Sequence, residues 1–515
     1  MIPIFQNCKL TDFSDNNNRQ AMYNALEKTR ATFGKMYPLT IGGERIESGD
    51  FLVSFNPGDK NMIVGMVSQA DPNLAHRAID SAWGAFHQWK KIPAEGRAEY
   101  LLKAAAIMKE RRFTLAAMMV YEAGKSWVEA DADVAEAIDF LEFYAREAIR
   151  WSANRPLTQV PGETNELVYL PLGAGVVISP WNFPCAILVG MTAGAIAAGN
   201  TIILKPASET PIIGAMFADI MAEAGLPPGV LNFVPGSGQI VGEYLVNSPH
   251  IRFISFTGSK QVGLSIAEKA NKNHEGQRWI KRVTAEMGGK DAIIVDNECD
   301  LDAAAKGVML SAFGYQGQKC SACSRVIVVR EVYEDFIARL VEKTKNITIG
   351  PMDNPAHYLG PVINKAAYDK IMSYIEIGKT EGKLIIGGVG DENKGYYIYP
   401  TIFRDVPWNS RLAQEEIFGP VLSIIFAENF DDALNIANST VYGLTGAVYT
   451  NNEEKIKKAK DEFYVGNLYF NRKCTGALVD VQPFGGFNLS GTDGKAGGRE
   501  YLLLFMQAKS ICRKN

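Results

Sequence analysis

Apolar runs of strand length alternate with segments of helix length from residue 175 onward. Runs at residues 175–179, 201–205, 230–234 and 251–256 are almost wholly apolar, and longer helical patterns separate them. Strands that are apolar throughout are typical of a parallel sheet that helices cover on both faces. The pattern therefore predicts a doubly wound α/β domain in this part of the chain.

A second alternating series follows a long helical pattern at residues 300–315 and predicts a second α/β domain. Residues 71–150 carry Ala, Glu and Arg at helical spacing, so we expect this part to be mostly helical. The strands and helices expected in the second series lie at residues 324–329, 334–345, 383–388, 431–440, 446–450, 452–463 and 465–470.

Length and charge fit a globular protein of two or three domains. The 515 residues are 47% hydrophobic, and 53 basic against 57 acidic residues give a formal net charge of −4. This balance provides no basic field for nucleic acid or for an anionic membrane, so neither partner is expected. No charged residue occurs from Leu167 to Leu204, but prolines and asparagines interrupt this stretch, which favours buried strands and a helix over a membrane span.

The N-terminal segment and the cysteines favour a cytoplasmic protein. Residues 1–18 lack the basic and then apolar order of a signal peptide, and Asp12 and Asp15 are atypical of a transit peptide. The seven cysteines are scattered along the chain, which is the distribution expected of reduced thiols rather than of a disulfide framework.

The stretch GYQGQKCSAC at residues 314–323 places Cys320 three residues before Cys323. A zinc site would need two further ligands, but the chain has no second Cys-x-x-Cys and its five histidines are isolated, so no metal is expected. A redox pair would be expected at a helix N-terminus in a small domain, whereas this pair follows a helical pattern. Cys323 is expected to begin a buried strand, the usual place of a free cysteine. A lone cysteine of such a pair can also be a nucleophile.

Glycine-containing turns are the candidate phosphate sites. GKS at residues 124–126 is not a P-loop, because Met119 stands where the first glycine is required, and we expect a helix terminus there. FTGSKQVG is more suggestive, since a strand runs into Gly258 and Ser259 and the next helix carries Gly263. Small residues at that junction would let a phosphate approach a helix N-terminus.

Seven short motifs occur along the chain in an order and spacing that point to a single kind of reaction. Their order and spacing resemble the NAD(P)-dependent aldehyde dehydrogenase superfamily, from about residue 38 to the C-terminus. The resemblance implies an α/β fold with two doubly wound domains and a small β element for oligomerisation. The motifs are SPWNFP with Asn182, ILKP with Lys205, FTGS with Ser259, AEMGGK with Glu286, GQKC with Cys320, EEIFGP with Glu416 and Phe418, and PFGGFNLSG with Phe484.

The same resemblance implies domain bounds and assembly. A homodimer or higher homo-oligomer is expected, because family members assemble through a protruding hairpin and a C-terminal segment. The implied parts are an N-terminal arm (1–37), an NAD(P)-binding domain (38–155 and 175–285, with 475–495), a catalytic domain (286–474) and an oligomerisation element (156–174 and 496–515).

By resemblance, Cys320 is the nucleophile that forms a covalent adduct with an aldehyde. The adduct's alkoxide would be held by the Asn182 side-chain amide and the Cys320 backbone N–H, and removing one such donor costs about 2.7 to 4 kcal/mol of barrier. Glu286 would be the general base that activates water for hydrolysis of the acyl-cysteine. Retention of Glu286 favours hydrolysis over transfer to coenzyme A, and the presence of Cys320 argues against a silent homologue.

The cofactor expected from the resemblance is NAD. Lys205 would contact the adenosine ribose, Ser259 and its turn the pyrophosphate, and Glu416 with Phe418 the nicotinamide ribose and ring. Ser208 stands where strongly NAD-selective members have a glutamate; without that carboxylate, repulsion of a 2′-phosphate is lost, so NADP stays an alternative. The full expected set is Ser179, Pro180, Trp181, Lys205, Ser208, Gly258, Ser259, Gly263, Glu416 and Phe418.

Local phrases at residues 122–146, 313–325 and 466–479 resemble the branch of the superfamily that oxidises L-glutamate γ-semialdehyde in proline catabolism. Another aldehyde, such as succinate semialdehyde, stays the alternative, and a proline dehydrogenase is a candidate partner. The implied substrate contacts are Ser321 and the backbone of Gly476 and Ala477 for the carboxylate, Phe183 and Phe484 for the stem, and Glu136 for the ammonium.

Two of these residues also have plainer interpretations. Phe484 is equally consistent with a core residue, and Glu136 with a solvated helix face. Cys323 stands where the resemblance implies a small residue such as glycine, so a disulfide with Cys320 under oxidation is a minor hypothesis.

Overall fold

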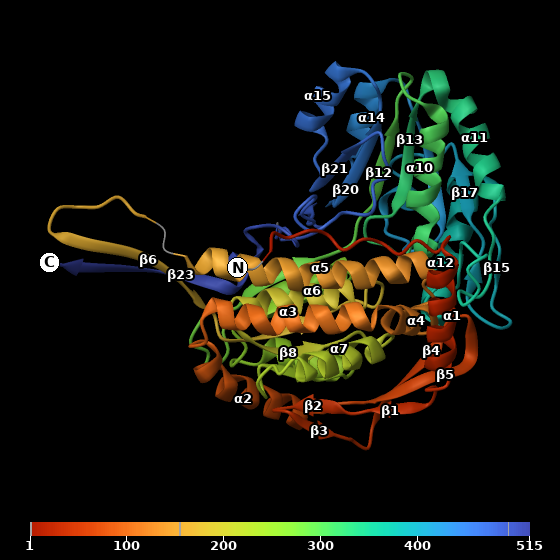
Figure 1. Ribbon diagram of the computed structural model, residues 1–515. Coiled ribbons are helices and arrows are strands. Elements are labelled where there is room, and N and C mark those ends of the chain that lie inside the picture. The colour runs from red at the N-terminus through yellow and green to blue at the C-terminus, as the bar shows by residue number, and fades with distance from the viewer. Residues whose placement is uncertain (1–2, 154–155, 493) are drawn as a thin grey trace.

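The computed structural model describes residues 3–153, 156–492 and 494–515. The predicted arm and domain ranges include residues 1–2, 154–155 and 493, which lie outside the described residues. Two seven-stranded sheets with flanking helices form two halves, the lower and upper parts of Figure 1. The predicted α/β fold class is confirmed.

The first sheet has the strand order β11-β10-β7-β8-β9-β2-β3. Strands β11 to β9 run parallel, whereas β2 pairs antiparallel with β9 and β3. The central strands are almost wholly buried, as their apolar runs predict. Its strands are β2 (Leu39–Ile41), β3 (Glu44–Ile46), β7 (Ala174–Ile178), β8 (Thr201–Lys205), β9 (Leu231–Phe233), β10 (Phe253–Thr257) and β11 (Arg282–Glu286).

The helices of this half include the long α5, which packs against α3, α4 and α6. Gly124, with φ of 63°, ends α4, and the Ser126 side chain accepts a hydrogen bond from the Glu129 N–H at the start of α5. GKS therefore lies at a helix terminus, as expected. The helices are α2 (Pro72–Trp89), α3 (Ala94–Glu110), α4 (Arg112–Ala123), α5 (Trp127–Ser152), α6 (Ala186–Ala197), α7 (Pro211–Glu223), α8 (Glu243–Asn247) and α9 (Lys260–Ala270).

The second sheet has the strand order β14-β17-β18-β13-β12-β20-β21. Its strands run parallel except β14, which pairs antiparallel with β17 at one edge. The strands are β12 (Asp291–Val295), β13 (Cys323–Val329), β14 (Lys383–Ile386), β17 (Thr401–Arg404), β18 (Val421–Ala427), β20 (Thr445–Tyr449) and β21 (Asn467–Phe470). The helices are α10 (Leu301–Phe313), α11 (Tyr333–Lys345), α12 (Lys365–Glu381), α13 (Arg411–Gln414), α14 (Phe430–Ala437) and α15 (Glu453–Glu462).

Four smaller sheets of the described residues lie outside these two, including the pairs β15 (Gly390–Asp391) with β16 (Tyr397–Ile398) and β19 (Tyr442–Gly443) with β22 (Phe487–Asn488). A three-stranded sheet of β1 (Lys35–Tyr37), β4 (Phe51–Asn56) and β5 (Asp59–Ser68) follows α1 (Asn16–Arg30), and the hydrophobic pattern did not predict it. Strands β6 (Glu163–Pro171) and β23 (Met506–Lys514) pair antiparallel in a ribbon that projects from the body in Figure 1. No helix within the described ranges is both long and apolar enough to cross a lipid bilayer.

Candidate active site

The carboxyl ends of four neighbouring parallel strands carry predicted site residues. Lys205 ends β8 and Glu286 ends β11, while Ser179 and Gly258 directly follow β7 and β10. These ends meet at one edge of the sheet because the strands are adjacent and parallel. Ligands of open α/β sheets bind at this edge.

Cys320 lies in a strained loop between α10 and β13. Three consecutive residues, 315–317, have backbone φ angles of 50°, 57° and 67°. These lie in the left-handed region, which residues other than glycine rarely adopt. The Gln316 side-chain amide anchors the loop by donating to the carbonyls of Gly124 at 2.9 Å and Pro361 at 2.8 Å. The fold therefore fixes the backbone that presents the thiol.

The surroundings of Cys320 disfavour its thiolate. Burial raises the pKa of the thiol, and the carboxylates of Asp291, Glu416 and Glu286 raise it further. The sulfur therefore carries a proton at neutral pH in the protein without bound ligands. Reaction at this sulfur requires a base to take the proton.

Asn182 and the cysteine loop are directly connected. The buried Asn182 side-chain amide donates a hydrogen bond of 2.9 Å to the backbone oxygen of Gln318, two residues before Cys320. The Asn182 backbone oxygen accepts a hydrogen bond of 2.8 Å from Lys125 Nζ. The structure thus brings two predicted residues, 138 positions apart in the sequence (320 − 182), to the same place.

Glu286 lies among glycines of the C-terminal motif PFGGFNLSG. The Gly486 N–H donates to Glu286 Oε2 at 3.4 Å, and Glu286 forms an isolated antiparallel bridge with Gly491. A Cβ on Gly485 or Gly491 would lie 3.1 Å from a carboxylate oxygen. Glycine at these positions leaves room for the carboxylate beside the cysteine, whose pKa it raises.

The predicted adenosine and phosphate residues lie along the same sheet edge. Lys205 is buried, which lowers its pKa to about 8, and among the described residues its Nζ donates only to the Pro206 carbonyl, at 3.1 Å. The Ser179 hydroxyl is buried and has no hydrogen-bond partner in the described part of the chain. Ser259 caps α9, and Gly263 in its first turn could not carry a Cβ without meeting Met287 Sδ at 2.6 Å.

Glu416 and Phe418 approach this edge from the second half of the molecule. The Gly289 N–H donates to Glu416 Oε1 at 3.1 Å, and burial raises the pKa of this carboxyl. The Phe418 ring lies edge-on to Trp181, with centroids 5.5 Å apart. Pro180, directly before Trp181, and Ser208, three residues after Lys205, are both half-buried.

The residues predicted to bind the substrate carboxylate lie in two segments of the chain. Ser321 is buried next to the nucleophile, and Gly476, with φ of 80°, lies in an exposed loop with Ala477. The Arg472 guanidinium donates to the carbonyls of Thr475 and Gly476 at 2.9 and 3.1 Å, which fixes this loop.

The burial of Phe484 and Glu136 bears on their plainer interpretations, as a core residue and as part of a solvated helix face. Phe183 and Phe484 are half-buried rather than core residues, and Phe183 packs edge-on against Tyr315 at 6.4 Å. Glu136 is not on a solvated helix face: it is half-buried, and burial, followed by the charge of Asp133, raises its pKa to about 8.

The second cysteine begins a buried strand, as predicted. Cys323 is the first residue of β13, and its thiol donates to the Arg325 carbonyl at 3.3 Å. The thiol of Cys323 lies next to that of Cys474. All seven cysteines are free thiols that form no disulfide. No group of three or more His, Cys, Asp or Glu side chains in the described ranges could hold a metal ion.

The chain matches the model of the aldehyde dehydrogenase family over residues 46–511. It belongs to that family. A 1-pyrroline-5-carboxylate dehydrogenase of Geobacillus sp. (strain WCH70) is 55% identical over 511 residues, which are 99% of each chain. A solved 1-pyrroline-5-carboxylate dehydrogenase from Thermus with bound NAD superimposes with a TM-score of 0.98 at 51% identity over 100% of both chains.

A longer relative contains a similar unit. Proline utilization A from Bdellovibrio bacteriovorus matches with a TM-score of 0.96 at 44% identity, over 99% of this chain and 53% of that one. The resemblance to the aldehyde dehydrogenase superfamily inferred from seven motifs is therefore confirmed over nearly the whole chain.

Sequence reasoning missed the buried charged side chains that support the loops of Asn182 and Cys320. Lys125 is fully buried and pairs with Asp133 at 2.8 Å, and Lys319, next to the cysteine, pairs with Glu129 at 2.6 Å. The sequence signal that could have revealed these charges was the occurrence of acidic residues on the otherwise apolar face of the helix at residues 127–152. A charge on such a face is buried and therefore needs a partner.

Proposed function

We propose that this chain oxidises L-glutamate γ-semialdehyde, the open form of 1-pyrroline-5-carboxylate, to L-glutamate with NAD in proline catabolism. The observation that carries the proposal is the identity of 55% over 511 residues with a 1-pyrroline-5-carboxylate dehydrogenase. Cys320, Asn182 and Glu286, which lie together, supply the chemistry that such an oxidation needs.

The proposed reaction starts at the Cys320 sulfur, which attacks the aldehyde carbon while its proton passes to a base. The former carbonyl oxygen becomes an alkoxide, and the Asn182 amide and the Cys320 N–H stabilise it by hydrogen bonds. NAD bound at this sheet edge would supply the hydride acceptor that the oxidation of the adduct needs. The resulting thioester is hydrolysed by a water that gives a proton to Glu286, and the thiol is regenerated as the carboxylate leaves.

The fit of this sheet edge to a dinucleotide rests on its unpartnered polar groups. The buried Ser179 hydroxyl and the Lys205 ammonium are suited to ribose hydroxyls, and the α9 N-terminus after Gly258 and Ser259 is suited to phosphate. Glu416 and Phe418 would hold the nicotinamide end. NAD is the proposed cofactor, and Ser208 leaves no carboxylate to repel the additional phosphate of NADP.

The proposed substrate contacts separate the two ends of the aldehyde. Ser321 and the N–H groups of Gly476 and Ala477 would bind the α-carboxylate, where a glycine lets the backbone approach an anion. Glu136 would bind the α-ammonium, since it forms no hydrogen bond or ion pair with the residues that the structure describes. Phe183 and Phe484 would flank the aliphatic stem.

Domain roles and partners are part of the same proposal. The dinucleotide-binding part comprises residues 38–155 and 175–285 with 475–495, and the catalytic part comprises residues 286–474. The projecting β6–β23 ribbon within 156–174 and 496–515 would join copies of the chain in a homodimer or larger assembly. A cytoplasmic location and a proline dehydrogenase as supplier of the substrate complete the proposal.

The test is NADH formation by the purified chain with a panel of aldehydes. Pyrroline-5-carboxylate should give a kcat/KM at least about tenfold above succinate semialdehyde and propanal, since each tenfold preference needs about 1.4 kcal/mol of differential binding. Cys320→Ser should be inactive with all of them. Equal rates across the panel would overturn the substrate assignment, and turnover by Cys320→Ser would overturn the mechanism.

A further inference from the structure

Lys125 is a fully buried lysine that contacts the backbone of Asn182. Its Nζ donates hydrogen bonds of 2.8 Å to Asp133 Oδ2 and to the Asn182 backbone oxygen. It also lies 4.1 Å from the ring centre of Phe183 and 4.4 Å from that of Tyr315. A buried ammonium with two oxygen partners and two ring faces has one well-defined position.

Asp133 holds the point at which the loop of Asn182 runs into α6. Its Oδ1 accepts a hydrogen bond of 2.6 Å from the Ala186 N–H, at the start of α6. The ion pair therefore contacts this segment at two points, at Asn182 in the middle of the loop between β7 and α6 and at Ala186, the first residue of α6. These two contacts tie the Asn182 backbone to the start of α6.

The residues directly before Lys125 hold the cysteine loop. The Ala123 carbonyl accepts from the Tyr315 hydroxyl at 3.2 Å, and the Gly124 carbonyl accepts from the Gln316 side chain at 2.9 Å. Three consecutive residues, 123–125, thus contact the loop of the nucleophile and the loop of the oxyanion donor. The junction of α4 and α5 is a common support for both.

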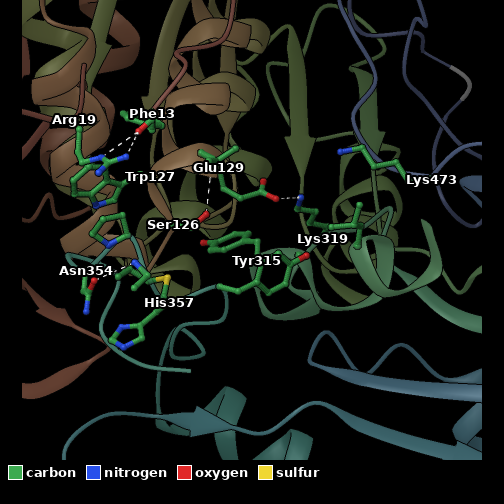
Figure 2. Close-up of a pocket in the computed structure, with 17 residues that line it drawn as sticks. Phe13, Arg19, Ser126, Trp127, Glu129, Tyr315, Lys319, Asn354, His357 and Lys473 are labelled. Atoms are coloured by element: carbon green, nitrogen blue, oxygen red, sulfur yellow. Dashed lines mark hydrogen bonds and ion pairs between the residues drawn. The ribbon is translucent and has the colours of Figure 1, made fainter. Parts of the chain in front are cut away.

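One face of α5 extends this support. Glu129, Asp133 and Glu136 are spaced four and three residues apart and so share a face. Glu129 pairs with Lys319, which precedes Cys320, beside a cavity of about 710 Å³ (Figure 2). Two of the three carboxylates therefore hold active-site loops, and the third is left to the substrate in the proposed function.

We propose that Lys125 and Asp133 are a positioning pair that sets the direction of the Asn182 amide relative to the Cys320 sulfur. This inference rests on the proposed role of Asn182 as the oxyanion donor. The pair does not touch substrate. It acts through the Asn182 backbone, so its loss should slow only those steps in which an oxyanion forms.

Acylation of Cys320 by 4-nitrophenyl acetate isolates such a step. The thiolate attacks the ester carbonyl, an oxyanion forms, and its collapse expels 4-nitrophenolate, which leaves an acetyl-cysteine. The burst of 4-nitrophenolate needs neither NAD nor the aldehyde. It therefore tests the positioning pair even if the proposed substrate is wrong.

The experiment is a double-mutant cycle on the burst rate constant. Asn182→Ala should lower it by about 10² to 10³, as removal of an oxyanion donor does. Lys125→Met should lower it by about tenfold or more with an unchanged half-saturating ester concentration, and should add less than about twofold in the Asn182→Ala background. An equal effect of Lys125→Met in both backgrounds, or none in either, would overturn the proposal.

Two further variants separate positioning from folding. Asp133→Asn keeps an acceptor for the Ala186 N–H and should also lower the burst rate constant, so it carries the same test if Lys125→Met does not fold. Asp131→Asn is the matched control: Asp131 lies on α5, is buried and pairs with Arg112, away from the site. A loss of burst rate in Asp131→Asn equal to that in Asp133→Asn would show that any buried charge on α5 has this effect and would contradict the proposal.

Discussion

Glu286, at the end of β11, pairs with Gly491 in an isolated antiparallel bridge. A Cβ on Gly491 would lie 3.1 and 3.2 Å from the two carboxylate oxygens. The position of the proposed general base is therefore coupled to a glycine 205 residues later in the chain (491 − 286).

Gly491→Ala should slow turnover by displacing Glu286. The new methyl group would push the carboxylate by a few tenths of an ångström, and misplacement by about 1 Å can cost about 10² in rate, so we expect a fall in kcat of about tenfold. Steady-state NADH formation measures it. Gly84→Ala, where a Cβ would meet no atom within 4 Å, is the control and should leave kcat unchanged.

Glu286→Gln should separate acylation from hydrolysis. Removing a general base lowers the rate of its step by about 10² to 10⁴, so a rapid burst of NADH should be followed by very slow turnover. Stopped-flow absorbance measures both phases. Glu331→Gln, at an exposed position, should behave as the parent; complete loss of the burst would mean that Glu286 is needed before the thioester forms.

Alkylation of Cys320 should accelerate with pH across the neutral and alkaline range. Burial and three nearby carboxylates raise the pKa of this thiol above its ordinary value, so the reactive thiolate fraction is small at neutral pH and grows as pH rises. The rate of iodoacetamide labelling at residue 320, followed by mass spectrometry from pH 6 to pH 9, should rise without a plateau. A plateau below pH 8 would contradict the expected shift.

Dinucleotide binding should weaken as pH rises through about 8. Burial lowers the pKa of Lys205 to about 8, so its ammonium loses a proton above that pH and the charge-assisted hydrogen bond to a ribose hydroxyl is lost. We expect the Kd of NADH to rise by about five- to tenfold between pH 7 and pH 9. Tryptophan quenching measures it, and Lys205→Met should remove the pH dependence, whereas Lys345→Met at an exposed position should retain it.

Ser321→Ala should discriminate between aldehydes with and without an α-carboxylate. A hydrogen bond to a charged group contributes about 1.5 to 3 kcal/mol, so kcat/KM for pyrroline-5-carboxylate should fall by about 10- to 100-fold. Propanal lacks the carboxylate, so its kcat/KM should change by less than about threefold. Equal losses for both aldehydes would indicate that Ser321 acts on the cysteine instead of on the substrate.

The sequence predicted those parts of the fold in which one residue pattern suffices. The parallel strands β7, β8 and β10 are buried along almost their whole length, so their apolar runs identify them. Strands β4 and β5 are partly exposed and mixed in character, and were missed for that reason. The direction of β14 also escaped prediction, because hydrophobic pattern carries no information on whether an edge strand runs parallel.

The candidate site divides in the same way, into residues that a local motif predicts and residues whose partners only the folded chain provides. Cys320, Asn182 and Glu286 could be predicted as the reacting groups because their motifs have a fixed order and a chemical role, and these roles stay predictions. Lys125 was assigned correctly to a helix terminus, but its contacts come from residues 133 and 182, and only the folded chain brings these together. Tertiary partners of a buried charge cannot be read from its immediate neighbours in the sequence.

The glycine loop around Glu286 has a consequence for biosynthesis. Residues 485–491 begin 165 positions after Cys320 in the chain (485 − 320), so they are translated later than the cysteine. A nascent chain on the ribosome therefore carries the nucleophile before its hydrolytic partner has a defined place. Until residues 485–491 pack against it, the Glu286 carboxylate therefore lacks the contact with the Gly486 N–H.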